Sequence, residues 1–148
     1  MKTYRFKLES VLNFREKMEE LLKKEFSAIR GELKKEEERL EAIVDLYKGE
    51  IDELLEKGEL TAGELGLYRD YMARLKDDIE EGKRVVELFE KKAEGKKEEL
   101  LEAKKNKKTL DVLKGKGLKR YMEAETRNEQ ASLDEYNSNN SRKGVFEE

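Results

Sequence analysis

Apolar side chains recur every three or four residues in the first third of the chain, and this spacing is the strongest constraint on its fold. The positions are Leu22, Phe26, Ile29, Leu33, Leu40, Ile43, Tyr47 and Leu54. Their steps alternate between four and three if Glu36 and Glu50 fill the two missing places. An average step of about 3.5 residues is typical of a helix that supercoils around another helix. The sequence therefore predicts a coiled-coil seam within a first helix of residues 8–56. Leu8, Val11, Leu12 and Met18 continue it with looser spacing.

A short break in this pattern predicts a turn at residues 57–61. Gly58 suits the left-handed position that commonly follows a helix end. Thr61 and Glu64 form a capping box, in which a threonine caps a new helix and a glutamate stands three residues later. A helix end followed directly by a helix start predicts a hairpin.

A second helix is expected over residues 62–136, with the same periodicity. Its seam positions are Tyr68, Met72, Leu75, Ile79, Gly82, Val86, Phe89, Ala93, Lys96, Leu100, Ala103, Lys107 and Leu110. Folding the chain at the turn places Leu40 opposite Ile79 and Phe26 opposite Ala93. The predicted fold is all-α, a single domain of residues 1–136 with two long helices in an antiparallel coiled-coil hairpin.

The second helix is longer than the first, so its C-terminal end is expected to overhang. Leu8 pairs near Leu110, which leaves residues 111–136 without an intramolecular partner. Isolated helices of this length are marginal in water. The overhang therefore predicts a partner or a second copy, and the Asn- and Ser-rich residues 137–148 are predicted to be a disordered tail.

Composition argues against catalysis and against a compact globular fold. The chain contains no Cys and no His, and 47% of its residues are charged. The commonest general base and metal ligands are therefore missing. We predict no enzymatic activity, no cofactor and no metal site. The N-terminus lacks a signal-peptide core, and no apolar run reaches the length of a membrane span.

Charge is unevenly distributed along the expected hairpin. Residues 32–56 carry ten acidic and four basic side chains, whereas residues 90–120 carry twelve basic and six acidic ones. The basic stretch has no aromatic residue between Phe89 and Tyr121 that could stack on bases. A solvated face or a dock for an acidic protein is therefore favoured, and nucleic acid is not an expected partner.

Aromatic residues near the predicted turn have two interpretations. Tyr47 and Tyr68 lie on the seam and are expected to be buried. Tyr71 lies off the seam, as does Leu46 on the first helix. These two side chains either form an exposed binding patch or belong to the general surface.

Both ends of the chain carry motifs that the seam does not require. Residues 4–16 read YRFKLESVLNFRE, residues 118–121 read LKRY, and residues 127–135 read RNEQASLDE. Together with the length and the two-helix layout, these motifs resemble the FliJ family of the bacterial flagellar export apparatus over residues 4–136.

The resemblance implies a cytoplasmic, non-catalytic component of the flagellar type III secretion machine, peripheral to the inner membrane at the flagellar base. Such proteins act as a stalk with the ring-shaped export ATPase, and they engage the export-gate protein FlhA and flagellar export chaperones. The residues that would face the ATPase are Arg127, Glu129, Gln130, Asp134 and Glu135. The residues of the region used towards the membrane-bound gate are Ile43, Leu46, Tyr47, Tyr71 and Leu75.

Two other functions remain open from the residues alone. One is a general coiled-coil scaffold or chaperone hairpin, either similar to an injectisome stalk or unrelated to one. The other is a nucleic-acid-binding arm, for which a steep salt dependence of binding would be diagnostic.

Overall fold

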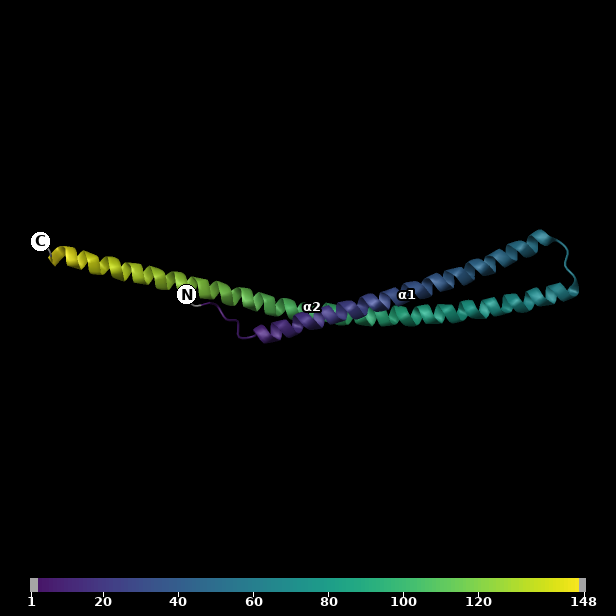
Figure 1. Cartoon of the computed structure of the whole chain (residues 1–148), viewed down its shortest axis with the longest axis horizontal. Coiled ribbons are helices and arrows are strands. Elements are labelled where there is room, and N and C mark those ends of the chain that lie inside the picture. Colours follow the sequence, from purple (N-terminus) through teal and green to yellow (C-terminus); the bar gives the residue numbers. More distant parts are fainter. Residues whose placement is uncertain (1–2, 147–148) are drawn as a thin grey trace. The chain divides into compact units, whose positions relative to one another are not determined.

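The computed structural model describes residues 3–146, which form two α-helices joined by a short turn (Figure 1). Helix α1 spans Glu9–Lys57 and contains 49 residues. Helix α2 spans Ala62–Phe146 and contains 85 residues. Residues 3–146 contain no β-strand. The prediction of an all-α hairpin with a longer second helix is confirmed.

The turn has the chemistry that its residues predict. Gly58 has a φ of 67°, a left-handed conformation that a side chain would disfavour. The Thr61 hydroxyl accepts a hydrogen bond from the Glu64 backbone N–H at 3.2 Å, and the Thr61 carbonyl accepts the first helical bond from Leu65 N–H at 3.0 Å. Thr61 is therefore the N-cap of α2.

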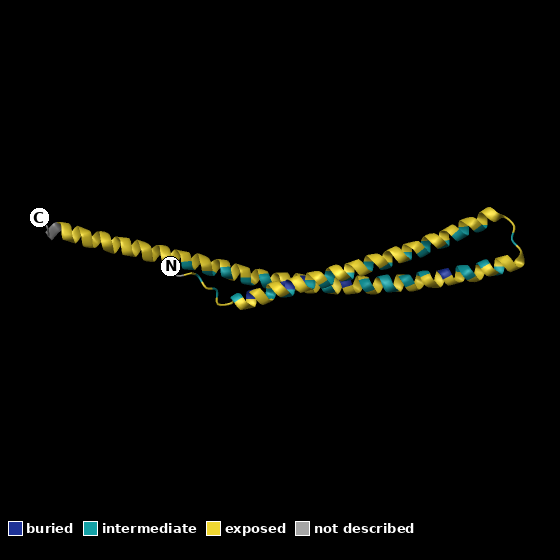
Figure 2. Ribbon diagram, in the orientation of Figure 1, coloured by how far each residue is buried: buried dark blue, intermediate teal, exposed yellow. Residues whose placement is uncertain are grey.

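Contacts divide the hairpin into two parts, residues 19–102 and residues 3–18 with 103–146. In the first part, α1 and α2 lie side by side and each presents its seam to the other (Figure 2). Every predicted seam position from Leu22 to Leu54 and from Tyr68 to Leu100 is buried or half-buried, including Glu36 and Glu50. Leu75, Ala93 and Leu100 are the least exposed of these, at 6–9%. The predicted seam is confirmed in this part.

Large and small side chains meet across this seam. Leu40 was expected opposite Ile79, but it reaches Gly82, the next seam position of α2. A Cβ atom on Gly82 would lie 3.0 Å from Leu40 Cδ1, so the absent side chain makes room for the leucine. Phe26 and Ala93 line the same surface groove, as expected if they face each other. Such pairing lets the helices interdigitate.

In the second part, the prediction that Leu8 and Val11 lie on the seam is wrong. Leu12 is buried at 3% exposure, whereas Leu8 and Val11 remain about two-fifths exposed, at 40% and 39%. The alternation of three and four residues runs through Leu12 and Arg15 here and continues at Glu19 and Leu22 of the first part, so two charged residues occupy seam positions. Glu19 is only 7% exposed and forms an ion pair with Lys23 at 3.2 Å. Sequence reasoning passed over both positions because their side chains are charged.

The C-terminal end differs from expectation in two ways. Residues 111–136 were expected to have no partner, but residues 3–9 contact α2 as far as Tyr121. The uncovered stretch therefore begins at Met122, and all side chains of residues 122–144 are exposed. In addition, α2 continues to Phe146, past the limit of residue 136 expected from the Asn- and Ser-rich sequence. Extending an existing helix carries no nucleation cost, and Asn and Ser weaken a helix far less than Pro does.

Candidate partner-binding surfaces

Charged groups in the structure are engaged in surface pairing. The pKa of Lys96 is raised by a hydrogen bond to Glu25 and by a second one to Glu99, at 2.8 and 3.1 Å. Residues 3–146 contain no group of three or more acidic, His or Cys side chains that could hold a metal ion. In the same residues, every buried polar side-chain atom has a hydrogen-bond partner.

These Lys96 contacts also define one side of the hairpin. Glu25 directly precedes the seam residue Phe26 of α1, and Glu99 directly precedes the seam residue Leu100 of α2. Both carboxylates reach the same ammonium group. Residues one place before corresponding seam positions of the two helices therefore lie on the same side.

The same rule places Leu46 and Tyr71 on one side of the hairpin, near the turn. Leu46 directly precedes Tyr47 and Tyr71 directly precedes Met72, so both lie on the side marked by Lys96. Leu46 is 46% exposed and Tyr71 is half-buried. We call these two residues the tip patch.

The other three residues expected towards the gate are less accessible than Leu46. Ile43 and Tyr47 are half-buried on the seam, and Leu75 is buried at 6% exposure. Leu75 therefore belongs to the packing between the helices, and Leu46 presents the most accessible apolar surface of the five residues.

Three exposed leucines beside the turn were missed by sequence reasoning. Leu55, Leu65 and Leu67 are 75%, 54% and 73% exposed. Nearby, the Lys57 ammonium lies 5.6 Å from the centre of the Tyr68 ring and 3.4 Å from its hydroxyl, which raises the pKa of Lys57. The sequence did offer one indication of them, because these leucines lie outside the predicted seam positions.

The residues expected to face an ATPase are all exposed on α2, but they do not form one cluster. Arg127, Gln130 and Asp134 follow helical spacing and share a face, where Gln130 Nε2 donates a hydrogen bond to Asp134 Oδ1 at 3.4 Å. Glu129 and Glu135 project in other directions from the same helix. The structure thus brings three of the five together.

An apolar stripe runs along a different face of this stretch. Leu118, Met122, Leu133 and Tyr136 have the spacing of one helix face, and their exposed fractions are 37%, 59%, 56% and 64%. The motif residues alone would not have identified this stripe. The C-terminal part of α2 therefore offers a polar face and an apolar face.

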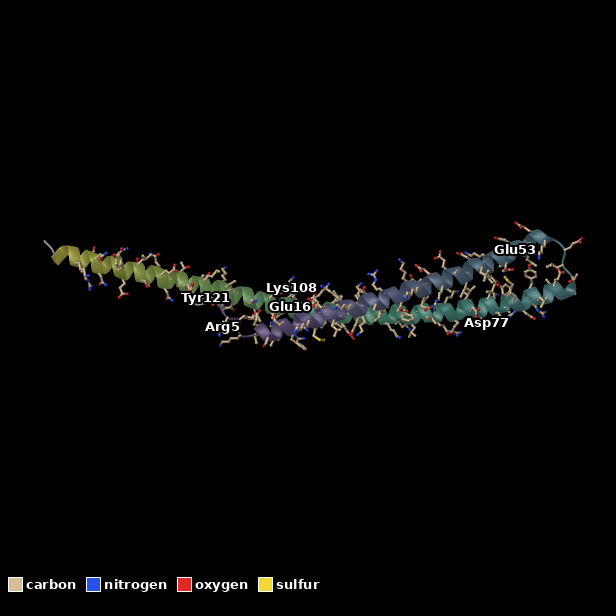
Figure 3. The ribbon with its side chains drawn as sticks, in the orientation of Figure 1. Arg5, Glu16, Glu53, Asp77, Lys108 and Tyr121 are labelled. Atoms are coloured by element: carbon tan, nitrogen blue, oxygen red, sulfur yellow. The ribbon has the colours of Figure 1, made fainter. Side chains whose placement is uncertain are left out.

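The N-terminal segment lies against α2 just before this uncovered stretch. The rings of Tyr4 and Tyr121 have their centres 5.6 Å apart and are tilted by 45°. Figure 3 shows Arg5 and Tyr121 at neighbouring places in this part of the molecule, and Arg5 lines a groove with Arg120. The Tyr121 hydroxyl donates a hydrogen bond to Glu125 Oε1 at 2.8 Å, which raises the pKa of Tyr121.

This geometry defines a class of protein, a two-helix coiled-coil hairpin with exposed apolar side chains near its turn and on the C-terminal part of α2. A family model described as Flagellar FliJ protein matches residues 4–145. The chain belongs to the FliJ family and is a component of the flagellar export apparatus. The match ends at residue 145 and so includes the helical residues beyond 136 that the motif resemblance left out.

The other comparisons add no relative. No curated protein and no solved structure matches the chain. Neither helix, over the residues that the structure describes, is long and apolar enough to cross a membrane.

Proposed function

We propose that this chain is the stalk of the flagellar export machine, coupling the ring-shaped export ATPase to the export-gate protein FlhA. The C-terminal part of α2 binds the ATPase, the tip patch binds the gate, and the chain assists the delivery of export chaperones. It acts in the cytoplasm, at the inner membrane beneath the flagellum, and it catalyses no reaction itself. Membership of the FliJ family supports this role, because the family is a component of export and not a known enzyme family.

The observation that carries the ATPase assignment is the uncovered end of α2. All side chains of residues 122–144 are exposed, yet Met122, Leu133 and Tyr136 are large and apolar. A helix without tertiary packing gains little stability from its own hydrogen bonds. Burial of this apolar stripe in a protein cavity would stabilise the helix and bind it at the same time.

The tip patch supports the assignment of a second, separate contact. Leu46 and Tyr71 lie on one side of the hairpin, and acidic residues dominate the surrounding part of α1. An aromatic and an aliphatic side chain with a polar surround are typical of the centre of a protein interface. The two proposed sites lie on different segments, so they can be tested independently.

Truncation after Thr126 tests the ATPase assignment. It removes all five motif residues of the C-terminal stretch but keeps Tyr4, Tyr121 and Glu125, whose contacts are described above. We expect the truncated protein to lose binding to the export ATPase and stimulation of ATP hydrolysis, while its circular dichroism per residue stays helical. Undiminished binding and stimulation would refute the assignment.

A tip variant provides the matched control. Leu46→Asp should weaken binding to the cytoplasmic domain of FlhA and leave ATPase binding unchanged, because Leu46 is exposed and its change leaves the seam intact. If the wild-type protein bound neither the ATPase nor FlhA, a general scaffold or chaperone hairpin would become the better assignment.

A further inference from the structure

The start of the chain covers the seam positions of α2 that follow Leu110. After Leu110, the three-and-four alternation continues through Lys114, Gly117 and Tyr121. Each of these contacts the start of the chain. Lys114 pairs with Glu9, the first residue of α1, at 2.9 Å; Gly117 lies under the Tyr4 hydroxyl; and the Tyr121 ring packs at a tilt against the Tyr4 ring. Residues 3–8 precede α1, and their Tyr4 covers the seam at Gly117 and Tyr121 in place of a helix.

Gly117 forms the notch that accepts Tyr4. A Cβ atom built on this glycine would collide with the Tyr4 hydroxyl, so only glycine leaves room for the ring in this position. The neighbouring Gly115 has nothing within 4 Å of such an atom. Of these two glycines, Gly117 alone is required for the contact.

The covered stretch adjoins an open one. The next seam positions along α2 are Ala124, Asn128 and Ala131, and all three are exposed. A partner whose cavity encloses this stretch of α2 contacts the seam as well as the apolar stripe. At the N-terminal limit of the stretch it meets Tyr121 and then the Tyr4 side chain. If the partner extends its contact towards Gly117, the Tyr4 side chain must first move out of the space beside that glycine.

The contacts that hold the segment are of a kind that opens easily. Tyr4 and Phe6 are half-buried, and the carboxylate and ammonium side chains of Glu9 and Lys114 are 46% and 41% exposed. Ion pairs this exposed are weakened by water and salt. Residues 3–6 lie outside α1, and Phe6 is joined to it by a single-turn hydrogen bond from Glu9 N–H at 3.2 Å.

We propose that residues 3–8 form a latch, which covers the α2 seam at Gly117–Tyr121 and must be displaced when the partner of the C-terminal stretch binds. This inference rests on the proposed function, because it takes the export ATPase as that partner. A closed latch lowers the apparent affinity in proportion to the fraction of molecules in which it is open. Release of the latch should therefore tighten binding.

Two glycine substitutions test the latch with a matched control. Gly115→Ala and Gly117→Ala raise the helix propensity of α2 equally, but only Gly117→Ala expels Tyr4. Tyr4→Ala removes the latch side chain and leaves α2 unchanged. Hydrogen exchange of residues 118–124 reports the latch directly, and circular dichroism checks folding.

We expect Gly117→Ala and Tyr4→Ala to lower the dissociation constant for the export ATPase by roughly threefold to tenfold, as expected for a state that is closed in most molecules. Gly115→Ala should bind as the wild type does. Dissociation constants for Gly117→Ala and Tyr4→Ala that equal or exceed that of Gly115→Ala would overturn the latch while leaving the stalk assignment intact. Failure of all four proteins to bind the ATPase would instead refute the stalk assignment, and the latch as its regulator with it.

Discussion

Leu40 reaches so far across the hairpin that its Cδ1 atom would stand 3.0 Å from a Cβ atom on Gly82. The two residues are seam positions of opposite helices, and the glycine supplies the space that the leucine fills. A shift of either helix by one heptad would remove this match. Paired large and small residues of this kind help to select one antiparallel register.

Alanine at Gly82 should therefore stabilise the protein less than alanine at a glycine with open surroundings. Replacing a helix-interior glycine by alanine gains about 1 kcal/mol of unfolding free energy. Gly95→Ala should realise that gain, because nothing lies within 4 Å of its added methyl group. In Gly82→Ala, crowding of Leu40 should remove about 1 kcal/mol or more. Urea unfolding followed by circular dichroism measures both, and equal gains would contradict the packing described here.

Replacing Leu75 by alanine should destabilise the protein more than replacing Leu46. Leu75→Ala removes a side chain that is 6% exposed and should cost about 2–3 kcal/mol of stability. Leu46 is 46% exposed, so Leu46→Ala should cost less than about 1 kcal/mol. Thermal unfolding of the two variants provides the comparison. A larger loss for Leu46→Ala would place it in the core and exclude it from the tip patch.

The Lys96 ion pairs should make stability depend on alkaline pH. The pKa of Lys96 is raised above 10.5 in the folded protein, first by Glu25 and then by Glu99. The pairs therefore stabilise the fold fully below pH 10.5 and lose their contribution as the pH rises through the folded-state pKa. Wild type should lose more unfolding free energy than Lys96→Gln between about pH 9 and pH 11.5. Lys97→Gln, which alters an exposed neighbour, should follow the wild-type profile; identical profiles for all three proteins would argue against the pairing.

The basic stretch of α2 should be stabilised by a single charge reversal. Lys104 stands one helical turn before Lys108, and residues with like charge at this spacing repel. Lys104→Glu replaces this repulsion by an attraction, because a glutamate four residues before a lysine forms a favourable pair. The unfolding free energy should therefore rise by about 0.5 kcal/mol. The gain should shrink in roughly 1 M salt, where the screening length is only about 3 Å. A gain independent of salt would point to a cause other than charge.

Most of the hairpin was predictable from local spacing. A helix turns by a constant angle per residue, so the positions of Phe26, Leu33 and Leu40 define a common face before any contact is known. The turn was predictable for a similar reason, because the Gly58 conformation and the Thr61 cap depend on neighbours in the chain.

The charged seam positions were harder to predict. Glu19 was passed over as a surface residue, yet it is 7% exposed. Periodicity assigns a residue to the seam whatever its chemistry, and a long charged side chain can cover apolar surface with its stem. Applying the spacing strictly would have identified it.

The candidate sites were predicted only in part. The terminal motifs located the C-terminal stretch, but they did not reveal that Arg127, Gln130 and Asp134 share a face while the apolar stripe occupies another. Near the turn, position on the seam could not separate the buried Leu75 from the half-buried Ile43. Burial depends on what lies opposite, which a single helix does not contain.

The sequence by itself determined the two helices, their turn and the faces that meet, because each of these follows from the regular geometry of a helix and from short-range hydrogen bonds. Only the tertiary structure decided how far the chain covers its own second helix. That limit is set by Tyr4 meeting Gly117 and Tyr121, residues more than a hundred positions away along the chain. The spacing of residues along one helix does not encode this contact, because it depends on the Tyr4 ring fitting beside Gly117 in the folded chain.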